Sequence, residues 1–299
     1  MTCYHIFLYF FDLLKGLCEA MDSNTKRRLQ IAAAKIRIGS IVGTYNAKSG
    51  HPGGSLSIAE ILAYLYFDKM NIDPADPGRA DRDRFVLSKG HAAPALYAAL
   101  ANRGFFPVEE LASLRKTGHF LQGHPDMKKV SGVDMSTGSL GQGISAACGM
   151  ALSAKHRGAD YRVYTIVGDG ESEEGQVWEA AMFAASKHLD NLTAFVDLNH
   201  LQIDGTIEEV NSPLPLDEKF AAFGWQVEVI DGHDLEAIER AVLAGEKSDK
   251  PCAIICNTVK GKGVSFMENV CGWHGVAPNE EEYKTAMAEL EQTLAALEK

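Results

Sequence analysis

The spacing of apolar residues predicts two helices in the first quarter of the chain. Over residues 24–45 apolar side chains recur every three or four positions, which is typical of an amphipathic helix. A segment rich in Gly and Pro, residues 49–54, interrupts the pattern. We expect Ser57 to cap a second helix that runs to about Phe67, because Glu60 follows three positions later as in a capping box.

Short apolar runs rich in Val, Ile and aromatic residues follow, and each ends in a Gly, Asn or Lys turn. They predict five strands, over residues 84–87, 161–167, 192–198, 225–230 and 253–259. Helical stretches separate these runs. Because nearly continuous apolar strands joined by helices are typical of parallel sheets, we expect an α/β fold with a mostly parallel sheet sandwiched by helices.

The first twenty residues differ from the rest of the chain. Residues 6–11 are apolar, but Asp12 and Lys15 follow, so the run is too short to span a membrane. The segment also lacks the basic leader and the small-residue cleavage site of a signal peptide. An ordinary sequence opens at Met21. We therefore expect residues 1–20 to be a non-native or disordered extension and residues 21–299 to form one domain.

Composition narrows the range of partners and compartments. The 299 residues carry a formal net charge of −11 and show no basic stripe, which argues against binding to nucleic acid or to an anionic membrane. Six cysteines are scattered without a CxxC pair. Cys252 and Cys256 lie on one face of a predicted strand. We expect buried, reduced thiols and a cytoplasmic location.

The chemistry-bearing residues lie at the ends of two neighbouring predicted strands. Gly168-Asp169-Gly170 ends one strand, a helix over residues 174–188 follows, and Asn199 ends the next strand. Two side-chain oxygens at one sheet edge, with a backbone carbonyl just beyond, supply half of an octahedral oxygen shell. Such a shell suits Mg²⁺, with Ca²⁺ or Mn²⁺ as alternatives, and phosphate oxygens and water fill the remaining positions. Gly170 lets a diphosphate approach the backbone closely.

The stretch from Gly168-Asp169-Gly170 to Asn199 and Gly205 resembles the thiamine diphosphate signature in the form that transketolases have. This resemblance implies a thiamine diphosphate-binding fold, with Asp169, Asn199 and the carbonyl of Leu201 as metal ligands. The asparagine pair usual in the family is Leu198-Asn199 here, and the ligating position is kept.

Further motifs follow the order found in transketolases, and the likeness extends over essentially residues 24–276. They are Ser49-Gly50-His51-Pro52-Gly53, Ser88-Lys89-Gly90-His91-Ala92, Gly123-His124-Pro125, Thr137-Gly138-Ser139-Leu140-Gly141-Gln142-Gly143, Lys260-Gly261-Lys262-Gly263 and Trp273-His274-Gly275. Four histidines thus lie in Gly-rich loops, where they suit hydrogen bonding and proton transfer near neutral pH. The others that match no motif, His119, His156, His188 and His233, are interpreted as structural or exposed.

The resemblance also implies a role for each residue in these motifs. Cofactor contacts fall to His91, Gly138, Ser139, Leu140, Gly170, Glu174, Asn199 and His274. Catalytic contacts with the sugar fall to His51, His124 and His274. Glu174 matches the glutamate that transketolases place at the subunit interface near the cofactor.

The implied reaction transfers a two-carbon glycolaldehyde unit from a ketose phosphate to an aldose phosphate, as in the pentose phosphate pathway. In transketolases, a glutamate beside the cofactor's pyrimidine ring lies in a second, C-terminal α/β domain. This chain has instead a charged, Ala/Leu-rich stretch over residues 280–297, which predicts a last helix. We therefore expect a separate C-terminal transketolase subunit that carries the pyrimidine-binding domain and this glutamate, in a heterotetramer of two chains of each kind.

Other functions share part of this pattern. The α subunit of a 2-oxoacid dehydrogenase, or a fragment of a deoxyxylulose phosphate synthase, would keep the cofactor and change the reaction. The first usually lacks the histidine loops at residues 49–53 and 88–92. A non-catalytic protein that binds the cofactor is a third alternative, which the intact metal and phosphate residues disfavour.

Overall fold

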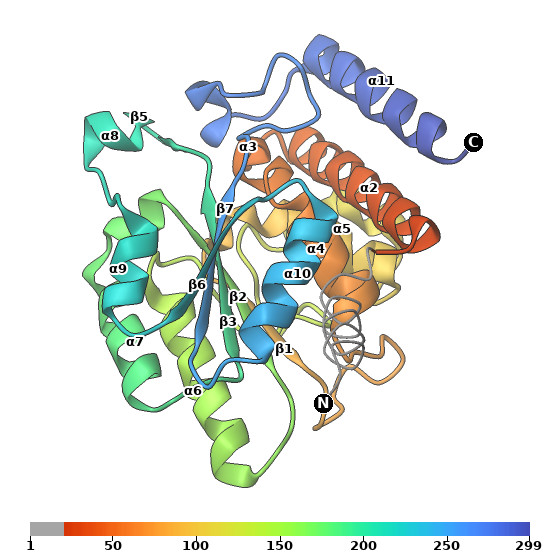
Figure 1. Ribbon diagram of the computed structural model, residues 1–299. Coiled ribbons are helices and arrows are strands. Elements are labelled where there is room, and N and C mark those ends of the chain that lie inside the picture. Colours follow the sequence, from red (N-terminus) through yellow and green to blue (C-terminus); the bar gives the residue numbers. More distant parts are fainter. Residues whose placement is uncertain (1–20) are drawn as a thin grey trace, which may run out of the picture.

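The computed structural model describes residues 21–299, so the expectation for residues 1–20 falls outside it. Its centre is a parallel sheet of five strands in the order β1-β2-β3-β7-β6 (Figure 1). The strands are β1 (Arg84–Leu87), β2 (Val163–Gly168), β3 (Leu192–Leu198), β6 (Gln226–Asp231) and β7 (Cys252–Asn257). The α/β fold with a parallel sheet is as the apolar runs predict.

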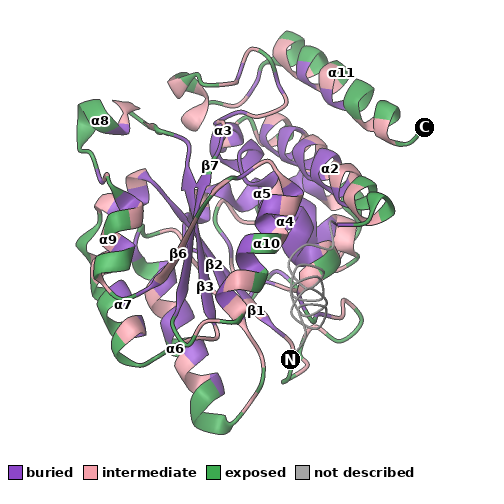
Figure 2. Cartoon of the chain, viewed as in Figure 1, coloured by how far each residue is buried: buried purple, intermediate pink, exposed green. Residues whose placement is uncertain are grey.

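Helices cover both faces of the sheet, and their apolar sides make two separate cores. One face carries α2 (Ser23–Ala47), α4 (Ala59–Tyr64), α5 (Ala93–Arg103) and α10 (Leu235–Glu246). The other carries α6 (Gln142–Arg157), α7 (Gly175–Ser186) and α9 (Leu216–Ala222). Because the three central strands are buried on both faces, they appear almost entirely buried in Figure 2.

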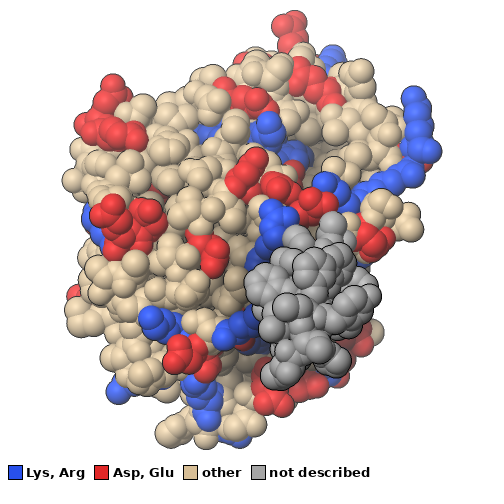
Figure 3. All heavy atoms as spheres, in the orientation of Figure 1, with Lys and Arg blue, Asp and Glu red and all other residues tan. Residues whose placement is uncertain are grey.

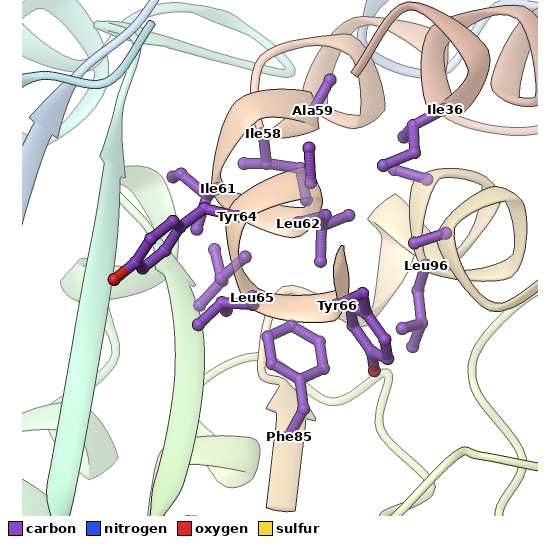
Figure 4. Close-up of a cluster of buried hydrophobic side chains, with 14 of the residues drawn as sticks. Ile36, Ile58, Ala59, Ile61, Leu62, Tyr64, Leu65, Tyr66, Phe85 and Leu96 are labelled. Carbon is purple, nitrogen blue, oxygen red and sulfur yellow. The ribbon is translucent and has the colours of Figure 1, made fainter. Parts of the chain in front are cut away.

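The core on the α2 side packs aliphatic side chains from α2, α4 and α5 against β1 (Figure 4). Tyr66 closes its lower end by meeting the ring of Phe85 edge-on, with 5.6 Å between ring centroids. Cys252 and Cys256 also belong to this core, on one face of β7. The expectation that these two thiols share a face and are buried is confirmed.

A helical extension lies across α2 at the C-terminal end of the chain. Helix α11 (Glu280–Leu297) coincides with the predicted span and begins with a capping box at Asn279. Its inward side chains, Ala286 and Leu290, pack with Val264 and with Ile41 of α2. Helix α2 thus lies between α11 on one side and α4 and α5 on the other.

The predicted second helix is wrong at its start. A short helix, α3 (Pro52–Leu56), forms inside the segment rich in Gly and Pro, and α4 begins only at Ala59. Ser57 is the C-cap residue of α3 and not the N-cap of α4, and its hydroxyl donates to the buried carboxylate of Asp197 at 2.8 Å. A carboxylate without water needs donors more than a helix end does. After α4 the chain continues as a π-helical turn, η1 (Leu65–Lys69).

Other boundaries differ by small amounts. The strand expected from residue 161 starts at Val163, and the last strand ends at Asn257 rather than at residue 259. The helix expected over residues 174–188 is preceded by a 3₁₀ turn, η4 (Gly170–Glu173), and α7 itself starts at Gly175. Helix ends routinely vary by a residue or two.

Within residues 21–299 no helix is both long and apolar enough to cross a bilayer. Acidic and basic side chains are mixed over the face shown in Figure 3.

Candidate active site

The carboxyl ends of the strands meet at one edge of the sheet, at the top of Figure 1. Helix α7 connects β2 to β3 on one face, whereas α10 connects β6 to β7 on the other. The direction of winding therefore reverses between the neighbouring strands β3 and β7. In open parallel sheets, ligands bind just outside the strand ends at such a switch point. Here a cavity of about 110 Å³ opens at this place.

Asp169 and Asn199 are in direct contact at the tips of β2 and β3. The register pairs Gly168 with Asp197, so the two residues follow their strands side by side. The Asp169 carboxylate accepts hydrogen bonds from the backbone N–H groups of Asn199 at 2.9 Å, His200 at 2.7 Å and Gly170 at 2.8 Å. The structure thus brings the two predicted metal ligands together.

A buried carboxylate orients the amide of Asn199. Asp197 is fully buried, and its Oδ2 accepts hydrogen bonds from Asn199 Nδ2 at 3.0 Å and from Lys89 Nζ at 2.5 Å. Thr258 and Ser57 donate to the same carboxylate. Because Asp197 binds the amide nitrogen of Asn199, the amide oxygen Oδ1 faces the loop that follows β3. There it accepts a hydrogen bond from the N–H of Leu201 at 3.1 Å.

The carbonyl of Leu201, the third predicted ligand, accepts a hydrogen bond from Lys260 Nζ at 3.0 Å. The same ammonium group lies 3.1 Å from Nδ1 of His274. Burial and the nearby ammonium of Lys89 lower the pKa of Lys260 to about 8. A cation therefore already sits against the predicted metal-binding carbonyl, within reach of the cavity.

The donor set fits a hard divalent cation. Burial and the adjacent carboxylate of Asp197 raise the pKa of Asp169 to about 6, so its negative charge is poorly compensated by the protein alone. Carboxylate, amide and carbonyl oxygens are the ligands that Mg²⁺ prefers. Within residues 21–299 no three His, Cys, Asp or Glu side chains form a metal-binding cluster.

Four histidines from four separate loops meet beside the cavity. The His51 ring centroid lies 5.2 Å from that of His91, 5.4 Å from that of His274 and 6.5 Å from that of His124. The rings of His91 and His274 are stacked at 5.2 Å. The predicted catalytic residues His51, His124 and His274 therefore lie in one cluster.

The histidine cluster is held neutral. Burial, with the guanidinium of Arg115 as the next cause, lowers the pKa of His51 to about 4. Burial and Lys260 lower the pKa of His274 to about 3. The pKa values of His91 and His124 are also lowered, mainly by burial. A neutral imidazole offers one donor and one acceptor, which suits hydrogen bonding to sugar hydroxyls.

The loop that carries Gly138, Ser139 and Leu140 is fixed from below by Glu171. This buried carboxylate accepts from the N–H of Gly141 at 2.9 Å, and from the hydroxyl of Ser88 at 2.6 Å. Gly138 has a φ of 154°, and a Cβ there would lie 3.2 Å from the His124 ring. Leu140 reaches the cavity and is 36% exposed, so an apolar side chain is available there.

The cavity wall contains seven of the predicted residues: His91, Leu140, Asp169, Gly170, Asn199, Leu201 and His274. Five other predicted residues are not part of the cavity wall: His51, His124, Gly138, Ser139 and Glu174. Glu174 is exposed at the start of α7, where its Cβ faces Gly141. The roles assigned to all these side chains stay predictions.

The cavity residues without a role in the prediction include three charged ones: Lys89, Lys260 and Asp197. The two lysines belong to motifs that the sequence analysis names. What marks them as candidates is their near-complete burial, which the sequence alone does not reveal. Two ammonium groups in a small cavity favour a ligand with several negative oxygens.

Comparisons with known proteins agree with this geometry. The family described as "Transketolase, thiamine diphosphate binding domain" matches residues 29–293. The chain is 54% identical over 244 residues to the 6-deoxy-6-sulfo-D-fructose transketolase subunit SqwG of Clostridium sp. (strain MSTE9), covering 81% of this chain and 89% of the relative. It is 43% identical to one of the subunits of the apulose-4-phosphate transketolase of Phocaeicola vulgatus, covering 91% of this chain and 96% of that one.

Longer transketolases match over their corresponding part. The human transketolase is 44% identical over 262 residues, and the match covers 85% of this chain but 40% of the human protein. The crystal structure of the Campylobacter jejuni transketolase superposes with a TM-score of 0.84 at 32% identity, over 93% of this chain and 46% of that chain. The chain thus belongs to the transketolase family and comprises its thiamine diphosphate-binding domain.

Proposed function

We propose that the chain is one subunit of a two-chain transketolase that binds thiamine diphosphate through Mg²⁺. It would transfer a two-carbon unit from a ketose phosphate to an aldose phosphate. The observation that carries this proposal is the contact between Asp169 and Asn199 at the strand tips, beside two buried ammonium groups and four neutral histidines.

Each group in the cavity has a use in this reaction. Asp169, Asn199 and the Leu201 carbonyl would hold the cation, and Lys260 and Lys89 would offset the charge of the diphosphate. Thiamine diphosphate, when bound, supplies the carbanion chemistry that breaks and forms the carbon–carbon bond. His51, His124 and His274 would donate hydrogen bonds to the sugar oxygens and move protons as charge develops on them.

A separate subunit is part of the proposal. The relatives that match along nearly their whole length are named as transketolase subunits, whereas the longer transketolases extend well beyond the match. We propose that a second chain supplies the pyrimidine-binding domain, in a heterotetramer with two copies of each. Leu140 and Ile203, both at the cavity and both exposed, would then be covered at the interface.

The names of the relatives suggest which sugars to test. One relative is named for 6-deoxy-6-sulfo-D-fructose and another for apulose 4-phosphate. Ordinary pentose phosphates are the default donors. Free, buried thiols at Cys148, Cys252 and Cys256 are compatible with a reducing, cytoplasmic setting.

The test is reconstitution. The purified chain is mixed with a chain that carries the remaining transketolase domains, with thiamine diphosphate and Mg²⁺. The aldose released from each sugar donor, or the CO₂ released from pyruvate, is measured. Donors are xylulose 5-phosphate, the two sugars named above, and pyruvate as the donor of a 2-oxoacid enzyme. We expect turnover with a sugar donor only when both chains are present. Appreciable turnover by this chain alone, or use of pyruvate in place of every sugar, would contradict the proposal.

A further inference from the structure

His233 lies away from the cavity wall, in the turn after β6, and its ring nitrogens contact two other parts of the chain. Its Nδ1 lies 2.9 Å from Oε2 of Glu60 on α4. Its Nε2 accepts a hydrogen bond at 2.9 Å from the backbone N–H of Val259, just beyond the end of β7. The side chain is 14% exposed.

The hydrogen-bond partners define the tautomer of this imidazole. A backbone N–H can only donate, so Nε2 accepts and carries no proton. The ring proton is therefore on Nδ1 and points at the carboxylate of Glu60. The guanidinium of Arg37 holds that carboxylate with two hydrogen bonds, at 2.7 and 2.6 Å. Arg37, Glu60 and His233 thus form a hydrogen-bond network that ends at Val259, and the donor and acceptor of each bond are defined.

Val259 is where strand β7 leaves the sheet. The N–H of Thr258 still bonds to the carbonyl of Leu198 in β3, but no strand neighbour is available for the next N–H on the β6 side. His233 supplies the acceptor for this half-buried N–H. The turn that carries His233 is tightly packed here, since a Cβ on Gly232 would lie 2.5 Å from Thr258 Cγ2.

The next residue is Lys260, whose buried ammonium lies between the Leu201 carbonyl and His274. The direction in which β7 leaves the sheet therefore decides where the stem of Lys260 begins. We propose that His233 is a positioning residue for the cofactor site, which holds Val259 so that Lys260 points into the cavity toward the diphosphate. This inference rests on the proposed function, because it assumes that the cavity binds thiamine diphosphate.

Two substitutions separate the two hydrogen bonds of His233. In His233→Gln the amide oxygen can take the place of Nε2 and accept from Val259, while the bond to Glu60 is lost. In His233→Asn the amide nitrogen can take the place of Nδ1 and donate to Glu60, while the acceptor for Val259 is lost. The two variants are close in size and polarity, so each is the matched control of the other.

The measurement is the dissociation constant of thiamine diphosphate, with saturating Mg²⁺, for the chain assembled with its partner. We expect His233→Asn to weaken binding about tenfold, as the loss of one hydrogen bond that orients a charged group would do. His233→Gln should stay within about threefold of the wild type, since the bond to Val259 is kept. The opposite order, or equal affinity in both variants and the wild type, would overturn the inference.

A double-mutant cycle shows whether the effect passes through Lys260. In a Lys260→Met background the ammonium is absent, so His233→Asn should cause no further loss of affinity. A full additional tenfold loss there would mean that His233 acts on the fold and not on Lys260. If His233→Asn does not assemble, as judged by gel filtration, His233→Gln decides alone: a loss of about tenfold would overturn the inference.

The wild-type control separates this inference from the proposed function. Failure of the assembled wild-type protein to bind thiamine diphosphate would overturn the proposed function itself. Tight binding by the wild type, together with unaltered binding by His233→Asn, would leave that function standing and overturn only the role of His233.

Discussion

Neutral histidines and buried lysines lie in or beside one cavity, and the division between them follows from their surroundings. His51 and His274 are partly buried beside cations, which penalises a further positive charge. Lys260 keeps a pKa of about 8 because Asp169 and Asp197 partly offset its burial. At pH 7 the cavity therefore holds fixed positive charge for an anion and uncharged imidazoles for hydroxyl groups.

This division predicts how the histidines titrate. In the unfolded chain a histidine has a pKa of about 6.5, whereas His51 and His274 have values of about 4 and about 3 in the folded chain. Below pH 6.5 the unfolded state thus binds more protons, so these groups lower the free energy of unfolding as the pH falls toward 4. We expect their ¹⁵N imidazole resonances to stay those of the neutral form at pH 5.5. Resonances would be assigned with His51→Gln and His274→Gln, and a midpoint near 6.5 for either would refute the prediction.

Sequence was informative for some of these residues and uninformative for others. The contact between Asp169 and Asn199 could be predicted because each directly follows a strand and the strands are neighbours. The position of Lys260 could not, since it depends on a loop that returns to Leu201, 59 residues earlier in the chain. His233, interpreted from the sequence as structural or exposed, makes hydrogen bonds 173 and 26 residues away, which no local pattern encodes.

At the scale of elements, α6 shows how closely the helices approach the strand ends. Gly143, in its first turn, packs on Ser88 at the end of β1, and a Cβ there would lie 2.5 Å from the Ser88 Cα. Gly149, further along the same helix, is exposed, and a Cβ added to it would meet no neighbouring atom within 4 Å. Gly143 permits α6 to approach the end of β1 closely, whereas Gly149 makes no such contact.

The two glycines therefore give a matched pair of substitutions. Gly143→Ala should lower the free energy of unfolding by about 1–3 kcal/mol, because the methyl group must displace backbone atoms. Gly149→Ala should raise it by up to about 1 kcal/mol, because alanine favours the helix. Urea denaturation followed by circular dichroism measures both. Equal effects of the two substitutions would show that α6 does not depend on its contact with Ser88.

The bounds of an element could be predicted where both of its faces are buried. They were predicted less well where a polar side chain bonds to a residue far away in the sequence. The span 192–198 coincides with β3, which is buried on both faces and leaves no ambiguity. The predicted start of the second helix was wrong because the two residues of the capping signature have other partners. Ser57 donates to Asp197, a residue 140 positions away, and the carboxylate of Glu60 contacts Arg37 and His233. A capping signature is local, and these long-range partners override it.

At the scale of the molecule, the site lies on an open edge of the sheet with its rim exposed. The histidine cluster and the strand tips come from six separate segments of the chain, only some of which adjoin a strand of the sheet. Their convergence depends on the order of the strands, which the sequence pattern alone does not define. This chain covers 89% and 96% of two relatives that are named as transketolase subunits, which supports the proposal of a second polypeptide at the site.

The most direct test of the account is whether Asp169 and a divalent cation together hold the diphosphate. Equilibrium dialysis with thiamine diphosphate would be done on the assembled protein, with Mg²⁺ or with EDTA. The samples are the wild type, Asp169→Asn, and Asp204→Asn as a control at an exposed carboxylate nearby. We expect tight binding only with Mg²⁺, and at least about a hundredfold weaker binding for Asp169→Asn, in line with the loss of a metal-binding carboxylate. Equal binding by Asp169→Asn and the wild type, or wild-type binding that EDTA leaves unchanged, would contradict the account.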